Sequence, residues 1–123
     1  MEIRALIVDD NKAFLGAATT LLEQEGLTVA GVASTGADAI RQAESLRPDV
    51  ILVDVFLGRE SGFELCRHLA EEAPGDRATL ILISTQAAAD LEDLIAGCPA
   101  AAFVPKAELS ADAIRRIVEG RRR

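Results

Sequence analysis

Polar residues that could do chemistry stand at the ends of several aliphatic runs in this sequence. The run ending at Val8 leads into two aspartates, and later runs lead to a third aspartate, to a serine and, after one proline, to a lysine. The set is Asp9, Asp10, Asp54, Ser84 and Lys106. Each has an ordinary role when taken alone, such as Asp10 capping the helix that follows. Their shared position predicts one pocket, because the carboxyl ends of parallel strands lie along one edge of a sheet.

Three carboxylates in one pocket repel one another unless a cation neutralises them. The available ligands are hard oxygens without nearby histidine or cysteine, which favours Mg²⁺, or else Mn²⁺, over Zn²⁺. A carboxylate beside such an ion can attack phosphorus and form an acyl phosphate. The ion, the Lys106 ammonium and the Ser84 hydroxyl would then each contact one oxygen of the transferred group.

The elements that must position this pocket alternate along the chain as strand and helix. The aliphatic runs predict strands over 3–8, 27–33, 49–54, 79–84 and 101–104. Helical spacing of apolar residues predicts helices over 11–25, from a cap at Ser34 or Thr35 to about 46, over 63–73 up to a Pro74-Gly75 turn, near 91–97, and through 114–118. A loop is expected between 54 and 63. Because the strands are continuously apolar, both faces of a parallel sheet should be covered, which makes this an α/β domain.

Length and composition exclude several classes of protein. A chain of 123 residues fits one domain, and no aliphatic run approaches the roughly 18 residues of a membrane span. A net charge of −7 and four Phe without Tyr or Trp argue against binding nucleic acid or an anionic membrane. No secretory signal opens the sequence, so we expect a cytoplasmic protein.

The cysteines are expected to be reduced and structural. Cys66 shares an apolar helical face with Phe63 and Leu69, which favours core packing. Cys66, Cys98 and the single His68 do not form a metal-binding pattern.

Several phrases occur in an order that identifies a family: ALIVDDN, GVASTGADAI, RPDVILVDVFLGRESG, ILIST and FVPK. Together they resemble the receiver domain of two-component response regulators, of the single-domain, chemotaxis-regulator-like kind, over essentially the whole chain. The resemblance implies a flavodoxin-like, doubly wound sheet of five parallel strands in the order 2-1-3-4-5. It also implies one receiver domain over 1–123 without a separate output domain. A fragment of a longer transcriptional regulator is the alternative.

The resemblance also assigns roles. Asp54 is implied to be the phosphoacceptor, and Ser84, Lys106 and Phe103 the switch hydroxyl, lysine and aromatic. The implied Mg²⁺ ligands are Asp9, Asp10, Asp54 and the backbone carbonyl of Phe56.

The implied function is a phosphorylation switch rather than a multiple-turnover enzyme. A histidine kinase or phosphotransfer protein would supply the phosphoryl group, and the surface of the fourth helix, fifth strand and fifth helix would then bind a target protein or a second copy. A phosphorylation-independent binding module and a Mg²⁺-dependent phosphohydrolase are alternatives. The intact set of polar residues argues against the first, and the lack of an evident cap over a small substrate argues against the second.

Some positions depart from the family pattern. Gly58 replaces a usual proline, which predicts a more mobile loop. Ala107 follows Lys106 where the family commonly has proline after a cis bond, so we expect a trans bond, a shifted loop or a strained exception here. Gly62 matches the family's glycine at the start of the third helix, where freedom in φ explains it.

The mouth of the pocket also differs. Thr85 stands where a smaller residue is typical, and Phe56 and Gln86 are expected nearby. These side chains could alter the access of water to an acyl phosphate.

Overall fold

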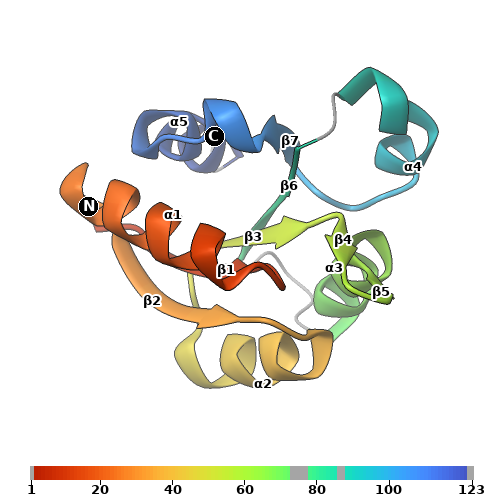
Figure 1. The fold of residues 1–123 in the computed structure, drawn as a ribbon, viewed down its shortest axis with the longest axis horizontal. Helices are drawn as coiled ribbons and strands as arrows, with labels where there is room; N and C mark the ends of the chain where they lie inside the picture. Colours follow the sequence, from red (N-terminus) through yellow and green to blue (C-terminus); the bar gives the residue numbers. More distant parts are fainter. Residues whose placement is uncertain (1, 73–77, 86–87, 122–123) are drawn as a thin grey trace.

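The structure, a computed structural model, describes residues 2–72, 78–85 and 88–121. At its centre is a parallel sheet of five strands in the spatial order β2-β1-β3-β6-β7, drawn in Figure 1. These strands are β1 (Arg4–Val8), β2 (Thr28–Ala33), β3 (Val50–Asp54), β6 (Thr79–Ser84) and β7 (Ala102–Pro105). When only the five strands of this sheet are numbered along the chain, the order is 2-1-3-4-5, so the predicted topology is confirmed. The predicted Pro74-Gly75 turn and the Gln86 side chain lie outside the described residues.

Helices cover both faces of the sheet. They are α1 (Lys12–Gln24), α2 (Gly36–Leu46), α3 (Gly62–Glu72), α4 (Glu92–Ala96) and α5 (Ala111–Arg121). The helices α1 and α5 pack on one face, and α2 and α3 pack on the other. In β3, Val50 and Leu52 enter the first core, whereas Ile51 and Val53 enter the second. The strands read as unbroken apolar runs because alternate side chains serve two different cores.

Side-chain caps determine where α1 and α2 begin. The Asn11 side chain accepts a hydrogen bond from the backbone N–H of Phe14 at 3.1 Å, so α1 starts after Asn11. The cap is therefore Asn11, and Asp10 is left to the acidic cluster at the sheet edge. Thr35 caps α2 in the same way, accepting from the N–H of Asp38 at 3.2 Å.

The segment after β3 is a small hairpin rather than the loop we expected. The short strands β4 (Phe56–Leu57) and β5 (Glu60–Ser61) pair in antiparallel fashion. Gly58 stands first in the turn between them with φ of 60°. Glycine favours this left-handed region in the turns of tight hairpins, and proline, whose φ is fixed near −65°, cannot adopt it. Glycine in place of the usual proline therefore allows a positive φ at position 58, which proline could not adopt.

Gly62 begins α3 as predicted, but for another reason. Its φ is not positive. A Cβ at this position would overlap the backbone carbonyl oxygen of Asp54 and would lie 2.8 Å from the Cα of Val55. The backbone N–H of Gly62 also donates to the Val55 carbonyl at 2.9 Å. Close approach to the chain that carries Asp54, and not conformational freedom, requires glycine here.

The helix predicted near 91–97 is present as α4 (Glu92–Ala96). A 3₁₀ turn, η1 (Ala88–Leu91), leads into α4, which has no side-chain cap and no buried residue. None of the helices in the described part of the chain has the length and apolarity to cross a bilayer.

Candidate functional site

Three aspartates converge at the carboxyl edge of the sheet. The strands β1 and β3 pair in parallel with Val8 opposite Val53, so the residues that follow lie side by side. A carboxylate oxygen from each of Asp9, Asp10 and Asp54 lies within 4.8 Å of the others. Asp9 and Asp54 are buried, whereas Asp10 is exposed. The structure thus brings together the predicted acidic set with one side open to solvent.

Lys106 enters this cluster from the end of β7. Its Nζ lies 2.6 Å from Oδ2 of Asp9 and 3.4 Å from Oδ2 of Asp54. The ammonium also lies 4.2 Å from the centre of the Phe14 ring, within the range of a cation–π contact. The lysine side chain is only 13% exposed, so its charge is directed at the aspartates rather than at water.

The two oxygens of Asp9 differ in their surroundings. Oδ1 accepts a hydrogen bond from the backbone N–H of Asn11 at 2.9 Å. Oδ2 is buried, forms an ion pair with the Lys106 ammonium and has no hydrogen-bond partner among the described residues. A buried carboxylate oxygen with spare acceptor capacity beside two further carboxylates fits a hard divalent cation such as Mg²⁺.

Burial and charge make Asp54 an unusual acid. Burial, followed by the negative charge of Asp9, raises its pKa from the ordinary 3.8 to about 6. Lys106 and the backbone N–H of Phe56, which donates to Oδ1 at 3.4 Å, act in the opposite direction. An added cation would stabilise the ionised form, which is the form that can act as a nucleophile.

The predicted hydroxyl and the predicted aromatics lie around this edge. Ser84 ends β6 and is 1% exposed, and β6 pairs with β3 so that Asp54 stands opposite Ile83. Phe103, in β7, is half-buried against the core that contains α3. Phe56 is 50% exposed beside Asp54. Their assigned roles remain predictions.

The structure describes the Lys106–Ala107 bond and one of the side chains expected at the pocket mouth. The described residues contain no cis peptide bond, so the trans bond expected between Lys106 and Ala107 is confirmed. Thr85 follows β6 and is exposed, whereas Gln86 is outside the described residues.

Sequence reasoning missed two groups that hold the site together. One is the backbone N–H of Asn11, which fixes the Asp9 carboxylate. The other is the Phe14 ring under the Lys106 ammonium. An aromatic residue in the first turn of the helix after the acidic pair is the signal that could have drawn attention to Phe14.

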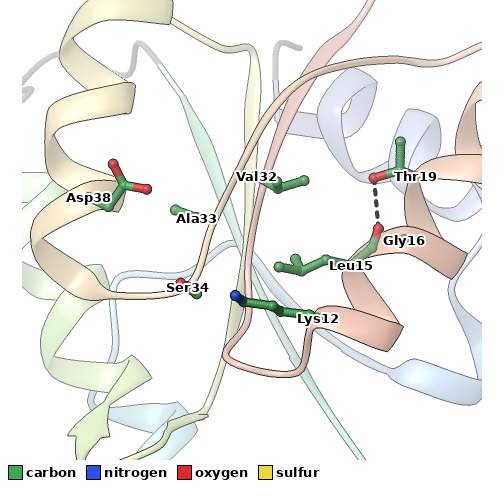
Figure 2. A pocket seen from close by; sticks show the side chains of 8 residues that line it. All are labelled: Lys12, Leu15, Gly16, Thr19, Val32, Ala33, Ser34 and Asp38. Carbon is green, nitrogen blue, oxygen red and sulfur yellow. Dashed lines mark hydrogen bonds between the residues drawn. The ribbon is translucent and has the colours of Figure 1, made fainter.

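A separate groove lies beside the acidic cluster, between α1, the end of β2 and the start of α2 (Figure 2). Its volume is about 400 Å³. It is lined by Lys12, Leu15, Gly16, Thr19, Val32, Ala33, Ser34 and Asp38. None of the clustered aspartates lines it, so the candidate chemistry lies at the open sheet edge and not in this groove.

Relatives of the chain were found among characterised proteins. A protein-glutamate methylesterase/protein-glutamine glutaminase of Alkalilimnicola ehrlichii is 34% identical over a stretch that covers 91% of this chain and 29% of that protein. The response regulator GacA of Pseudomonas aeruginosa is 32% identical over 98% of this chain and 57% of that protein. The chain therefore spans less than two thirds of the length of either relative.

A solved structure and a family model agree with these relatives. A CheY-like response regulator receiver domain protein from Methanospirillum hungatei superposes with a TM-score of 0.79 at 27% identity, covering 98% of this chain and 94% of that one. The family model for the response regulator receiver domain matches residues 5–119. A match over nearly the whole chain, together with the sheet order and the acidic edge, shows that this chain belongs to the response regulator receiver domain family.

Proposed function

We propose that residues 1–123 form one phospho-accepting receiver domain of two-component signal transduction, with Asp54 as the phosphoacceptor. One observation carries the proposal: three carboxylates and one ammonium meet at an edge of the sheet that is open to solvent. A macromolecular donor requires such access, because a phosphorylated histidine must approach Asp54 from outside.

The chain's own residues suit an in-line transfer. An ionised oxygen of Asp54 attacks the phosphorus of a phosphohistidine on a kinase or phosphotransfer protein, the P–N bond breaks and the imidazole leaves with that electron pair. The Lys106 ammonium, 3.4 Å from Oδ2 of Asp54, can pair with an oxygen of the incoming group. The acyl phosphate then carries the charge of the phosphoryl group, and the departing imidazole nitrogen takes up a proton from solvent.

Receiver domains bind Mg²⁺ at an acidic pocket, and the aspartate cluster of this chain has the donor chemistry for it. We assign the ligands to Asp9, Asp10, Asp54 and the backbone carbonyl of Phe56. When bound, Mg²⁺ supplies positive charge that offsets the carboxylates and one phosphoryl oxygen.

The readout would be a change of surface. We assign the Ser84 hydroxyl, which follows the residue opposite Asp54 in β6, to hydrogen-bond a phosphoryl oxygen. Movement of Ser84 would let Phe103 of β7 rotate inward and alter the face formed by α4, β7 and α5, which would bind a target protein or a second copy. The chain would act as a switch and not as a multiple-turnover enzyme. A donor kinase that uses ATP would place it in the cytoplasm.

Labelling with a small phosphodonor tests the proposal. Acetyl phosphate with Mg²⁺ should add one phosphoryl group to the intact protein, detected by mass spectrometry and removed by hydroxylamine, which cleaves acyl phosphates. Asp54→Asn and chelation of Mg²⁺ should each abolish the label, and Asp112→Asn, an exposed aspartate on α5, should retain it. Label that persists in Asp54→Asn would refute the assignment. A complete lack of label in the unaltered chain would favour a phosphorylation-independent binding module.

A further inference from the structure

The hairpin of β4 and β5 lies against the acidic cluster. The backbone N–H of Phe56 donates to Oδ1 of Asp54 at 3.4 Å. The turn also approaches Asp10, because a Cβ built on Gly58 would lie 3.5 Å from its Oδ2. The hairpin therefore touches two of the three clustered aspartates. It also carries the Phe56 carbonyl that we assign to Mg²⁺, so the position of the hairpin determines where that oxygen lies.

This hairpin is too short to keep its position by itself. Each of its strands has two residues, and an isolated two-stranded hairpin is only marginally stable in water. The core below holds one side, since Leu57 is 2% exposed and packs among buried side chains. Glu60 pairs with Leu57 across the hairpin and holds the other side. Its carboxylate oxygens lie 3.1 and 3.3 Å from the backbone nitrogen of Gly36, whose N–H donates to them.

The start of α2 is well suited to receive this carboxylate. Gly36 is the first residue of α2, so its N–H has no acceptor within the helix. The Thr35 side chain caps the N–H of Asp38 and leaves that of Gly36 to Glu60. A carboxylate at this end also faces the positive end of the helix dipole. A Cβ on Gly36 would lie 2.5 Å from Oε1 of Glu60, so glycine at this position makes room for the contact.

We propose that Glu60 is a positioning residue that ties the hairpin to α2 and so holds the Phe56 carbonyl at the acidic cluster. The inference rests on the proposed function, because it takes that carbonyl as a Mg²⁺ ligand. Groups that orient a metal ligand without touching the ion change metal affinity by about tenfold or more when they are removed. Loss of the Glu60 carboxylate should let the hairpin move and weaken Mg²⁺ binding, while the aspartates of the cluster stay in place.

Calorimetric titration of the full chain with magnesium chloride tests the proposal. Glu60→Ala should raise the Kd for Mg²⁺ by about tenfold. Glu60→Gln keeps an oxygen that can accept from the N–H of Gly36, so its Kd should stay closer to that of the unaltered chain. Glu44→Ala removes the same charge from an exposed position on α2 and should leave the Kd unchanged. This control separates the contact from the general effect of a lost negative charge.

A second variant displaces the carboxylate without removing it. The added Cβ in Gly36→Ala meets the far end of the flexible Glu60 side chain, and its next neighbour is a Leu65 methyl carbon at an ordinary 3.6 Å. The helix should therefore form, which circular dichroism checks, while the carboxylate is pushed away. Gly36→Ala should weaken Mg²⁺ binding as Glu60→Ala does. The double variant should bind no more weakly than Glu60→Ala alone, because both changes remove one and the same contact.

Hydrogen exchange followed by mass spectrometry examines the hairpin without metal. With a chelator present, a peptide covering 55–62 should exchange faster in Glu60→Ala than in the unaltered chain, because fewer contacts hold the hairpin closed. A peptide from α5 should exchange at the same rate in both proteins.

Several results would overturn the proposal. They are an unchanged Kd in Glu60→Ala, equal weakening by Glu44→Ala, effects that multiply in the double variant, and equal exchange of 55–62 in the metal-free proteins. A failure of the proposed function looks different. An unaltered chain that binds no Mg²⁺ would refute the ligand assignment and with it the role of Glu60, whereas equal affinities among chains that do bind Mg²⁺ would refute the role of Glu60 alone.

Discussion

Replacement of Asp54 by asparagine should stabilise the protein at neutral pH. The asparagine keeps an acceptor for the N–H of Phe56 but removes one negative charge beside Asp9. The pKa of Asp54 is raised from 3.8 to about 6, mainly by burial and then by the charge of Asp9. The folded state therefore holds this proton more tightly than the unfolded chain does, and its stability falls as pH rises from about 4 to about 6. Above that range, the unaltered protein carries an electrostatic cost that the variant lacks.

The size of the effect follows from the two pKa values. A pKa increase from 3.8 to about 6 corresponds to at most about 3 kcal/mol, at about 1.4 kcal/mol for each pKa unit. Solvent reaches the cluster on the side of Asp10, which is exposed, and reduces this limit. The substitution removes little of the favourable charge interaction of Lys106, because the shorter contact of its ammonium is with Asp9. We expect Asp54→Asn to raise the free energy of unfolding by about 1 to 2 kcal/mol at pH 7.5.

Urea unfolding followed by circular dichroism measures this difference, since the sequence has no Trp or Tyr for fluorescence. The increase in the free energy of unfolding should be near zero at pH 4 and reach its full value by pH 7.5, with a chelator present at both pH values. Glu44→Gln, an exposed position on α2, removes a charge elsewhere and should show no such pH dependence. An Asp54→Asn variant that is no more stable than the unaltered protein at pH 7.5, or whose gain is the same at both pH values, would refute the reasoning.

Three further substitutions test the groups around the site. Lys106→Met should lower the free energy of unfolding by about 3 kcal/mol, because it leaves the buried Asp9 carboxylate unpaired. Adding Asp9→Asn to that variant should restore most of the loss, and simple additivity of the two changes would contradict the pairing. Gly62→Ala should cost about 3 kcal/mol in thermal unfolding because its Cβ meets the backbone of β3, whereas Gly16→Ala, with nothing within 4 Å, should gain about 0.5 kcal/mol. Asn11→Ala should cost about 1 kcal/mol in urea unfolding through loss of the α1 cap, and an unchanged midpoint would contradict that role.

The strands of the sheet could be predicted because the apolar or polar character of each residue shows where a buried strand runs and where it ends. Each inner strand must bury side chains on both faces, and β3 does so with Val50 and Leu52 on one side and Ile51 and Val53 on the other. Within β3 no polar residue occurs before Asp54, because each of the preceding side chains enters one of the two cores. The first polar residue therefore marks the strand's end, which is why the sequence alone could place Asp9 and Asp54 at one edge of the sheet.

Two features around the site could not be predicted in this way. The pairing of β4 with β5 involves too few residues to show an alternating pattern. The close approach at Gly62 depends on the path of the chain after β3, and φ alone suggested a different reason for the glycine. In each case, the deciding neighbour lies on another element, where local propensity carries no information.

The choice of partner by Lys106 has a consequence for the order of events in the proposed reaction. Its ammonium lies nearer to Asp9, at 2.6 Å, than to Asp54, at 3.4 Å, and Asp9 is 0% exposed. Lys106 cannot leave Asp9 for a phosphoryl oxygen on Asp54 unless another cation neutralises that buried carboxylate, since an unpaired buried charge is strongly unfavourable. A cation held by Asp9, Asp10 and Asp54 would supply that charge, and Lys106, which already contacts Asp54, could then turn to the phosphoryl group. Asp9→Asn, which removes one carboxylate from the cluster, should therefore weaken Mg²⁺ binding in a calorimetric titration, while Lys106 keeps its contact with Asp54.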